Sequence, residues 1–519
     1  MDLVAIIITC YALYLLCLGI YRLLFHPLAQ YPGPKIAALT VWYEFYYDAI
    51  QRGRYTFQIQ RMHEKYGPIV RISPNELHVN DPAFIDDLYA GGGKKRDKYP
   101  YFSAQFGIPD SVFGTPGHDL HRLRRGALNR FFSKASVTKL EPIIHRAIEK
   151  LVAQLEHHHA GTNSPVTMTM AFSCMTTDIV TEYAFAKSYG FLDSPTFEPN
   201  FHRAIIAGSD MGPWIKQFPW LISLMNKLPQ TIVTRINPEA TVYVQFQEDI
   251  RRQIRQAQDR IASGEKPTDG GLTRTIFHEL LTGDLPEQEK RLERLWQEGQ
   301  IVVGAGTETT AWTLSATLYY LLENTAVLTK LQEELNTAIA DPSERVSWSR
   351  LEQLPYLSAV ICEGLRLSYG VSTRLQRINP LGPFRFKTQV SDGMGGSRCM
   401  EYVIPLGTPV GMTATLIHAH PELFPDPYTF KPERWLDENG MRHHNLDGYL
   451  LSFSRGSRQC LGINLAYAEL YMGIALLIRR LGSRMKLFET TREDVEIHYD
   501  RFVPTPKDGT KGIRVLVAE

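Results

Sequence analysis

The stretch FSRGSRQCLG, at residues 453–462, decides how this chain is interpreted. It has the form Phe-x-x-Gly-x-Arg-x-Cys-x-Gly, and five fixed positions make a chance match in a chain of this length as rare as about one in ten thousand. Its cysteine, Cys460, is one of six. The other five are scattered, without the repeated spacing of a disulfide framework or a zinc cluster. The pattern therefore singles out Cys460 as the cysteine with a chemical role.

A cysteine in such a loop is suited to bind iron. As a thiolate it is a metal ligand whose pKa the metal lowers, and it pushes electron density onto iron, which favours cleavage of the O–O bond. A lone cysteine would favour the alternative of a buried structural thiol, but the spacing argues against it. The apolar run 461–481 follows the loop. We expect it to form a helix whose positive N-terminal end points at the thiolate.

The other fixed positions suit a porphyrin bound at this iron. Gly456 permits a tight turn, and Gly462 permits close approach of the backbone to a flat ring. Arg458 can pair with a propionate, and Phe453 can pack beside the sulfur and keep water away from it. With this loop, the sequence resembles the cytochrome P-450 family. The resemblance implies haem b as the cofactor, with Cys460 as the metal ligand.

A second family pattern is AGTETT, at residues 305–310, which lies mid-way along the longest helical stretch, about 287–323. Small residues let a helix pass close over a flat cofactor, and the Thr309 hydroxyl can bond to the Ala305 carbonyl and bend the helix. The resemblance implies that Thr309 and Glu308 are catalytic and supply protons to bound oxygen. The alternative is a threonine cluster beside a solvated glutamate, which this pattern alone would favour.

Weaker family patterns concern a buried network and the propionates. EGLR, at residues 363–366, and PERW, at residues 432–435, imply a structural network of Glu363, Arg366 and Arg434. HRLRR, at residues 121–125, corresponds to the family's Trp-x-x-x-Arg. Here His121 replaces tryptophan and can still donate a hydrogen bond to a propionate. Arg125 and Arg377 are further propionate candidates, and the alternative for these two arginines and His121 is a solvated basic face.

The N-terminal residues predict a membrane anchor. Leu3 to Tyr21 is uncharged and about nineteen residues long, enough to span a hydrocarbon core. Positive charge on its C-terminal side places the rest of the chain in the cytosol, and the alternative is a buried core helix. We therefore expect an anchor at 1–25, a proline-rich hinge at 26–35 and a haem-binding domain at 36–519, with a single-pass location in the endoplasmic reticulum membrane.

The body of the chain predicts a mainly α fold with a minor β-sheet. Val70 to Val79 alternates around a Ser73-Pro74-Asn75 turn and predicts a short hairpin. We expect an exposed loop at 263–271 and short strands in the proline- and glycine-rich region 382–447. Helical periodicity is found at 137–155, 240–262, about 287–323, 351–367 and 461–481. No internal boundary is visible, and the resemblance implies one large domain around one haem.

Composition and charge limit the classes of molecule that this protein is expected to bind. The 519 residues carry 56 Lys and Arg against 55 Asp and Glu, a net charge of +1, which disfavours a nucleic-acid partner. No dinucleotide, flavin or iron–sulfur pattern is present. We therefore expect electrons to come from a membrane-bound NADPH-dependent cytochrome P-450 reductase, and cytochrome b5 is a further candidate. Arg122, Arg124 and Arg130 could steer an acidic partner, and plain exposed charge is the alternative.

The narrower resemblance, carried by FHPLAQYPGPK and LSYGVSTRLQR, is to filamentous-fungal microsomal members of secondary metabolism such as trichodiene-oxygenase-like enzymes. It implies a monooxygenase that inserts one oxygen atom from O2 into a hydrophobic terpenoid or polyketide-type molecule. The alternatives are a haem-thiolate isomerase, dehydratase or peroxide-using enzyme, and a haem sensor or electron carrier. The family layout implies substrate contacts, with core packing as the alternative, at Phe102, Phe106, Phe113, Val302, Val303, Val371, Ser372 and Phe502.

Overall fold

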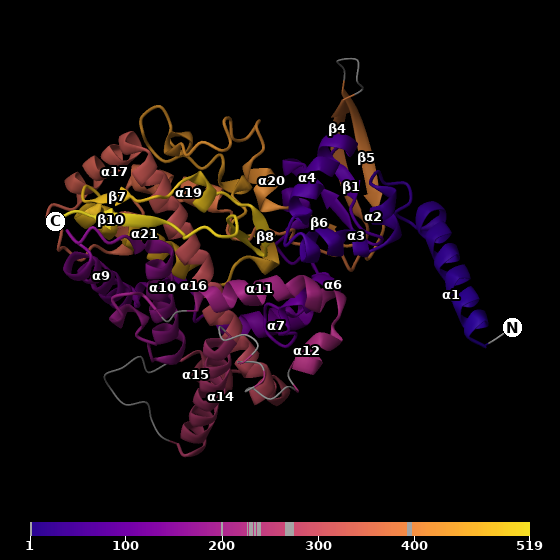
Figure 1. Ribbon diagram of the computed structural model, residues 1–519, viewed down its shortest axis with the longest axis horizontal. Helices are drawn as coiled ribbons and strands as arrows, with labels where there is room; N and C mark the ends of the chain where they lie inside the picture. Colours follow the sequence, from indigo (N-terminus) through magenta and orange to yellow (C-terminus); the bar gives the residue numbers. More distant parts are fainter. Residues whose placement is uncertain are drawn as a thin grey trace.

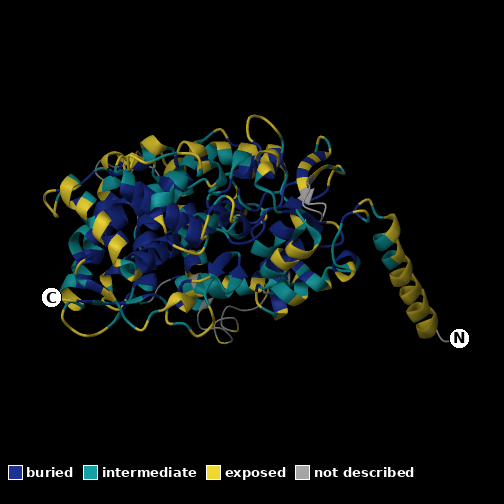
Figure 2. Ribbon diagram, turned by 90° about the horizontal axis from the view of Figure 1, so that it is seen from above, coloured by how far each residue is buried: buried dark blue, intermediate teal, exposed yellow. Residues whose placement is uncertain are grey.

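The computed structural model describes residues 3–198, 201–225, 227, 232, 235, 240–264, 275–391 and 397–519. Its first helix, α1 (Leu3–Ile20), continues as a short π-helical turn over Tyr21–Phe25. This segment projects away from the body of the molecule (Figure 1). None of its residues is buried, and its mean hydropathy over 18 residues is 2.6. Figure 2 shows this helix exposed over most of its length and partly covered near the body, while the buried residues gather inside the body.

Helices make up most of the body, and they follow the hydrophobic periodicity of the sequence. The N-terminal helices precede and follow the first two strands: α2 (Lys35–Leu39), α3 (Trp42–Phe45), η2 (Tyr46–Ile50), α4 (Tyr55–Tyr66), η3 (Pro82–Phe84), α5 (Ile85–Leu88), α6 (Pro100–Ser103), η4 (Ala104–Phe106), α7 (His118–Asn129) and α8 (Lys134–Thr138). The middle helices are α9 (Glu141–His158), α10 (Met168–Phe185), η5 (Phe191–Asp193), α11 (His202–Gln217), α12 (Trp220–Met225), α14 (Ala240–Ala262), α15 (Ile276–Thr282), η6 (Glu287–Glu289) and α16 (Leu292–Glu323).

The remaining helices are α17 (Thr325–Ala338), α18 (Trp348–Leu351), α19 (Pro355–Ser368), α20 (Ala414–His418), η7 (Pro432–Trp435), η8 (Asp447–Tyr449), η9 (Gly456–Arg458), α21 (Ile463–Leu481) and η10 (Arg492–Asp494). The largest hydrophobic core lies where α9, α10, α16, α19 and α21 pack together. The long helix α16 passes through the middle of the molecule, and α10 and α21 lie against it (Figure 1).

The strands form small separate sheets. β1 (Ile69–Arg71) and β2 (Leu77–Val79) are antiparallel, with Ile69 opposite Val79, and β6 (Val410–Gly411) joins β2 in parallel. β10 (Arg514–Val517) lies between β3 (Val166–Thr167) and β7 (Met485–Leu487). Two further hairpins pair β4 (Phe384–Ser391) with β5 (Ser397–Ile404), and β8 (Tyr499–Arg501) with β9 (Val503–Thr505). The predicted mainly α fold with a minor β component, and the predicted hairpin, are confirmed.

Two predicted helices have the wrong N-terminal boundary, and proline explains both. The single helix expected at 137–155 is interrupted between α8 and α9, and Pro142 lies in the first turn of α9. The helix expected at 351–367 is divided between α18 and α19, and α19 begins at Pro355. Proline is compatible with the first turn of a helix but not with its interior, so it marks a new start. Most of the exposed loop predicted at 263–271 lies outside the described residues.

Candidate functional site

The loop that carries Cys460 is held to the rest of the fold by backbone and arginine contacts. The Cys460 amide donates to the Phe453 carbonyl at 2.8 Å, and the loop enters α21 through Gly462. Gly456 has φ +70°, and a Cβ there would lie 2.2 Å from the Tyr89 carbonyl oxygen, so only glycine fits. Gly462 differs, since a Cβ there would meet no protein atom within 4 Å. The protein itself therefore leaves open space beside Gly462, where the sequence predicted a close approach to a flat ring.

Cys460 has an accessible side chain although it lies within the fold. Burial raises the pKa of its thiol, and the Gly462 amide and Arg125 act in the opposite direction. The side chain is nevertheless exposed, as is that of Ala305 in the middle of α16. A side chain that is accessible but closely surrounded by protein lines an internal hollow. Phe453 is half-buried, and its ring packs against Tyr467, 5.1 Å between ring centres.

Buried cations gather beside this loop. Arg458 donates to the carbonyls of Thr115 and Pro116 at 2.7 and 2.5 Å, and its Nε is buried without a partner. Arg125 donates to the Gln459 carbonyl at 2.6 Å, and Arg377 to the Gln376 carbonyl at 2.9 Å. Burial and the neighbouring Arg377 lower the pKa of Arg458 to about 9. The three predicted arginines therefore lie close enough to repel one another.

Lys98 belongs to the same cluster, and the sequence did not reveal it. Its ammonium donates to the Phe113 carbonyl at 2.5 Å and lies 3.8 Å from the centre of the Phe113 ring. Burial lowers its pKa well below the usual value, and Arg458, Arg377 and Arg125 add to that effect. In the sequence it is one cation of the run KKRDK, at 94–98, which has no periodicity that would select it.

His121 is buried in this cluster as a neutral imidazole. Burial and the charges of Arg458 and Lys98 lower the pKa of His121 to about 2. We call Lys98, Arg125, Arg377 and Arg458 the cation cluster. Among the described residues, no carboxylate lies within 4.0 Å of the charged nitrogens of this cluster. Buried charges are normally paired, so a ligand carrying carboxylates fits here. A flat group with two propionates and a metal for the adjacent sulfur meets this requirement.

The second predicted motif lies on α16, with its residues on different faces. Thr309 Oγ1 donates to the Ala305 carbonyl at 2.9 Å, as expected, and α16 is continuous across the motif. Gly306 does not face the open side. A Cβ there would lie 2.8 Å from the Val180 side chain of α10, so Gly306 allows the two helices to pack. Ala305 and Gly304 instead have space beside them.

Glu308 is buried and paired, so the alternative of a solvated glutamate is wrong. Its side chain is 5% exposed, and Oε2 lies 2.9 Å from Nδ1 of His202, at the start of α11. Burial opposes a charged imidazole, but the Glu308 carboxylate outweighs it, and the pKa of His202 is raised above its usual 6.5. His202 lies 106 residues from Glu308 in the chain, and no sequence pattern connects the two.

A further buried carboxyl lies beneath the motif. Glu469 of α21 is 1% exposed and bonds to Thr310. Burial raises its pKa well above the usual value, which favours the neutral form of this carboxyl. The sequence shows Glu469 inside an apolar helix, a signal that could have marked it as an unusual residue.

The structure brings Glu363, Arg366 and Arg434 together, in the arrangement that the sequence patterns implied. Glu363 and Arg366 form two parallel bonds of 2.8 Å, and Arg434 Nε lies 3.0 Å from Glu363 Oε1. The Trp435 indole and the Lys431 amide complete the carboxylate's partners at 2.9 Å each. Every charge here is met by a partner from the same chain.

The predicted substrate contacts divide into two groups. Phe106, Phe113 and Phe502 lie together, with ring centres 4.8 to 5.7 Å apart, and Phe102 contacts Phe106 at 6.1 Å. Val371 lines a small cavity with Tyr89, Leu375 and Met412. The four phenylalanines form one aromatic cluster, and Val371 lies at a separate cavity.

Two of the residues predicted as substrate contacts are fully buried within the protein. Val303 is 1% exposed and belongs to the main core. Successive helix residues are about 100° apart, so Val302, seven positions before Thr309, shares its face, whereas Val303 does not. Ser372 is fully buried and donates to the Asp500 carboxylate at 2.8 Å, so its hydroxyl is occupied within the protein.

Arg124 is likewise not available to steer a partner. It is 4% exposed and forms a 2.7 Å ion pair with Glu289 and a 2.8 Å bond to the Thr115 hydroxyl. Arg122 and Arg130 are exposed, as predicted. The three arginines share one short helical segment, and only tertiary contacts separate the buried one from the others.

Comparison with known proteins assigns this arrangement to a family. The sequence model described as Cytochrome P450 matches residues 32–496. Similar proteins include the cytochrome P450 monooxygenase tpcC of Cochliobolus heterostrophus, 43% identical over 97% of this chain and 95% of the relative. The tryptophan 6-hydroxylase fscE of Fusarium equiseti is 41% identical over 99% and 96%. The N-acetyltryptophan 6-hydroxylase ivoC of Emericella nidulans is 39% identical over 98% and 96%.

These names describe hydroxylation and monooxygenation, and not isomerisation or electron transfer alone. The site of this chain has features that suit such an activity: an accessible cysteine, adjacent cations and the Glu308–Thr309 pair of α16. The chain therefore belongs to the cytochrome P450 family of haem-thiolate enzymes and is a monooxygenase.

Proposed function

We propose that Cys460 is the thiolate ligand of a haem b iron and that the cation cluster, with His121, holds the haem propionates. The supporting observation is the cluster itself, a set of buried and half-buried cations that, among the described residues, has no carboxylate within 4.0 Å and only the charge of Asp97 nearby. Haem supplies, when bound, the iron at which O2 is reduced and from which one oxygen atom passes to the substrate. Phe453 shields the sulfur, Gly456 sets the turn, and Gly462 leaves room for the ring.

The protein's part in oxygen activation is the delivery of protons. Thr309 presents a hydroxyl on the open face of α16, next to Ala305. Glu308 is the adjacent acid, and His202 holds its carboxylate and is itself partly exposed. A proton can enter from solvent at His202 Nε2 and pass from Nδ1 to Glu308 Oε2. Because Glu308 and Thr309 lie on different faces of α16, the step onward to the Thr309 hydroxyl needs a bridging water. Burial of Glu308 restricts this route to the His202 side.

Glu363, Arg366 and Arg434 have a structural role in this proposal. Arg366 donates to the carbonyls of His418 and Pro427 at 2.8 and 2.6 Å, and His418 accepts from the Leu451 amide at 2.8 Å. The network therefore supports the chain just before the loop that carries Cys460. It contacts neither the cation cluster nor the accessible face of α16.

The substrate is a hydrophobic small molecule of fungal secondary metabolism. The aromatic cluster of Phe102, Phe106, Phe113 and Phe502 supports this class. Terpenoid and polyketide-type molecules are the first candidates. An indole is the second, because two similar proteins are named as hydroxylases of tryptophan and N-acetyltryptophan, and aromatic rings pack well on one another.

Electrons come from a separate NADPH-cytochrome P450 reductase, with cytochrome b5 as a second donor. Exposed Arg122 and Arg130 lie on α7 and at its end, the helix that also carries His121 and Arg125. An acidic partner attracted there would approach the side of the cation cluster.

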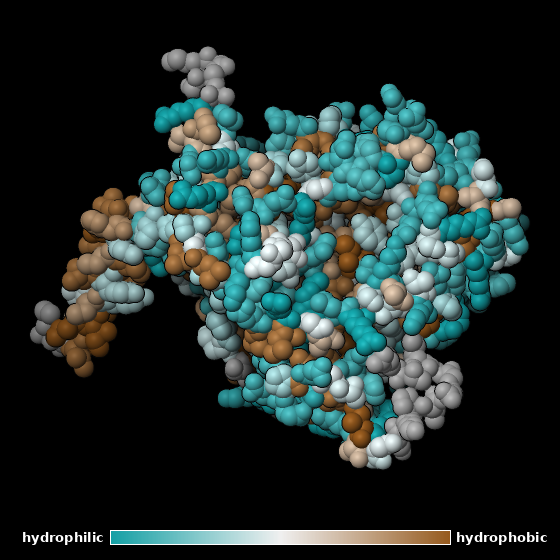
Figure 3. Space-filling view, turned by 180° about the vertical axis from the view of Figure 1, so that it is seen from behind, coloured by the Kyte–Doolittle hydropathy of each residue, from teal (hydrophilic) through white to brown (hydrophobic). Residues whose placement is uncertain are grey.

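We further propose residues 1–25 as a single-pass anchor in the endoplasmic reticulum membrane, 26–35 as a hinge and 36–519 as the cytosolic haem domain. The supporting feature is the exposed apolar helix α1, which is covered by hydrophobic side chains in Figure 3. Trp42 and Trp220 are also exposed, and both contact the Phe218 ring. Tryptophan is favoured at membrane interfaces, so this patch suits a body that rests on the bilayer.

The decisive experiment is the ferrous–CO spectrum of the purified protein. Wild type is expected to show the strongly red-shifted band of a thiolate haem, and Cys460→Ala is expected to lose it. Cys399→Ala, which removes an exposed cysteine on β5, is the control and should keep the band. A red-shifted band that survives in Cys460→Ala would refute the ligand assignment.

A second experiment tests Thr309. A substrate is first found by incubating the protein with reductase, NADPH and terpene, polyketide or indole compounds, with products detected by mass spectrometry. Thr309→Ala is then expected to lower product formed per NADPH by about tenfold or more, because one proton donor is lost. Thr309→Ser, which keeps the hydroxyl, should retain most of it. Equal coupling in wild type and Thr309→Ala would remove the proposed role.

A further inference from the structure

A cavity of about 390 Å³ lies between α11, the η2 turn and the β8–β9 hairpin. One part of its wall is aromatic, formed by Phe102, Trp214 and Phe502. Phe502 also contacts Phe106 and Phe113, so the cavity adjoins the aromatic cluster that we assign to the substrate. The rest of the wall includes six charged residues, which is unexpected for a site that takes only a hydrocarbon: Asp48, Arg52, Asp210, Lys216, Asp500 and Arg501.

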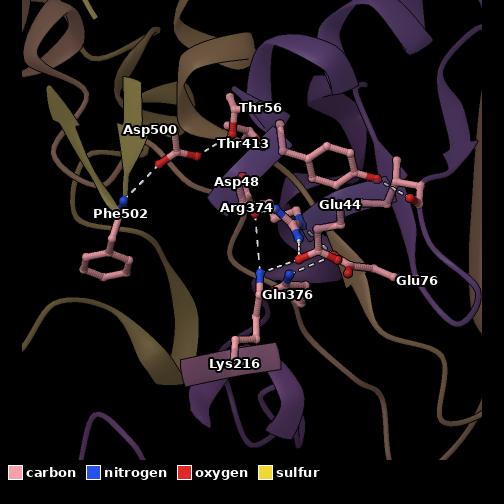
Figure 4. A network of polar contacts seen from close by, with 12 residues as sticks. Glu44, Asp48, Thr56, Glu76, Lys216, Arg374, Gln376, Thr413, Asp500 and Phe502 are labelled. Atoms are coloured by element: carbon pink, nitrogen blue, oxygen red, sulfur yellow. Dashed lines mark hydrogen bonds and ion pairs between the residues drawn. The ribbon is translucent and has the colours of Figure 1, made fainter. Parts of the chain in front are cut away.

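Next to the cavity, and including its lining residue Lys216, is a set of ion pairs whose charges balance (Figure 4). Glu44 accepts from both Lys216 and Arg374, and Arg374 Nε also lies 3.0 Å from Glu76. Gln376 donates to the same Glu76 oxygen at 2.7 Å. Two cations and two carboxylates thus satisfy one another, and all four side chains are almost fully buried.

The opposite side of the cavity is also balanced. Asp210 lies 3.0 Å from Arg52 and 2.7 Å from Arg501, and Asp508 pairs with the same two arginines at 2.5 and 2.8 Å. These four groups carry no net charge. They therefore give no reason for a charged ligand to bind.

Two carboxylates remain, and both line the cavity: Asp48 and Asp500. Asp48 Oδ2 is 3.4 Å from Lys216 and 3.8 Å from Arg374, longer than the bonds that these cations make to Glu44. Asp500 accepts from Thr56, Ser372 and the Phe502 amide, which are all neutral groups. The cavity therefore has an excess of two negative charges beside an aromatic wall.

Both carboxyls have pKa values above the usual range, and burial is the largest cause. Burial raises the pKa of Asp48 to about 6, although Lys216 and Arg374 oppose it, and Glu44 and Asp500 add to the rise. Burial also raises the pKa of Asp500. Charged carboxylates that are short of cations are stabilised by a cation from outside.

We propose that this cavity binds the protonated amine of an aromatic amine, with Asp48 and Asp500 as counter-charges and the ring against Phe102 and Phe502. The ligand class is an arylalkylamine whose ammonium lies at the charged end. This inference rests on the proposed function, because the ring would extend from the cavity into the aromatic cluster. It sharpens the substrate class from a hydrophobic molecule to one that carries a basic nitrogen.

The test uses the full-length holoenzyme as its ferrous–CO complex, so that the amine cannot bind to iron. Tryptamine and 3-ethylindole, which differ only by the amino group, are compared by equilibrium dialysis at pH 7.5. Tryptamine is expected to bind about tenfold more tightly, the effect of one buried charged hydrogen bond. Equal affinity of the two compounds, with the red-shifted CO band present, would overturn the amine site and leave the haem assignment intact.

Variants locate the site. Asp48→Asn is expected to weaken tryptamine binding by about tenfold and to leave 3-ethylindole binding unchanged. Asp249→Asn, which removes the same charge on α14 outside the cavity, is the control. Asp500→Asn is the second variant. If either cavity variant folds, as the CO band shows, and still prefers tryptamine as wild type does, the proposal is wrong.

The pH dependence of the wild type gives an answer without any variant. Asp48 becomes protonated as pH falls below about 6, while the amine of tryptamine remains charged. Tryptamine affinity is therefore expected to fall between pH 7.5 and 5, and 3-ethylindole affinity to stay constant. Parallel behaviour of the two compounds over this range would contradict the role of Asp48.

Discussion

Two buried groups of charged residues in this molecule differ in how their charges are met. In the Glu363–Arg366–Arg434 network, each oxygen of the carboxylate has partners from the same chain at 2.8 to 3.0 Å. In the cation cluster, the arginines and Lys98 donate mainly to backbone carbonyls and repel one another. The first arrangement is complete without a ligand, and the second is not. A buried charge is therefore informative about function when its own chain does not neutralise it.

The largest effect is expected from breaking the complete network. Glu363→Gln would leave Arg366 fully buried with its charge unpaired, and such losses cost about 3–5 kcal/mol of unfolding free energy. Urea unfolding monitored by circular dichroism measures this cost. The control is Glu433→Gln, a partly exposed residue paired with Lys330, where a change below about 1 kcal/mol is expected. Similar stability losses in the two variants would mean that the network is not the structural element described here.

A smaller and different effect is expected from the cation cluster. Lys98→Met removes a repelling charge, so the apoprotein should be at least as stable as wild type. Haem should be lost about tenfold faster, because one propionate contact is missing. Transfer of haem to apomyoglobin measures the rate, and urea unfolding measures apoprotein stability. Lys95→Met is the control, since Lys95 is exposed and pairs with Asp119. If Lys98→Met destabilises the apoprotein and does not lose haem faster, the cation cluster has a structural role like that of the Glu363–Arg366–Arg434 network.

The smallest effect is expected from the His202–Glu308 pair. Its two charges meet each other, as in the complete network, but only while His202 is protonated. The pKa of His202 is raised above 6.5 by Glu308, so the charged pair is fully formed below pH 6.5 and is lost as pH rises through the raised value. Glu308→Gln should therefore lower the pKa of His202, because burial is then the largest remaining influence. An NMR titration of 15N-histidine in the ferrous–CO form, with His202→Gln to assign the signal, measures this change.

The matched control for that titration is Glu198→Gln, the other carboxylate that raises the pKa of His202. It should shift the titration much less than Glu308→Gln does, because Glu308 is the bonded partner at 2.9 Å. If the two variants shift the pKa of His202 equally, Glu308 is not the main partner of His202, and the pair no longer supports proton delivery by this route.

The substrate region shows where reasoning from sequence succeeded and where it did not. Helical phasing relates Val302 to Thr309, and applying the same phasing to Val303 would have excluded it. Ser372 is different, because its hydroxyl is taken by Asp500, 128 residues away, and no spacing in the sequence reveals that bond. Lys98 and His202 were missed for the same reason, since Lys98 meets Arg377 and Arg458 and His202 meets Glu308, all from distant segments.

The sequence by itself determined the features that depend on local spacing. These are the cysteine loop, the motif on α16, the apolar length of α1 and the helical character of the body, which follow from turns, helix periodicity and hydrophobic length. Only the tertiary structure decided which charges are balanced. Arg124 meets Glu289 across 165 residues, whereas Arg125, the next residue, joins the cation cluster. Charge pairing depends on how segments pack in space, and the chain carries no periodic signal for it.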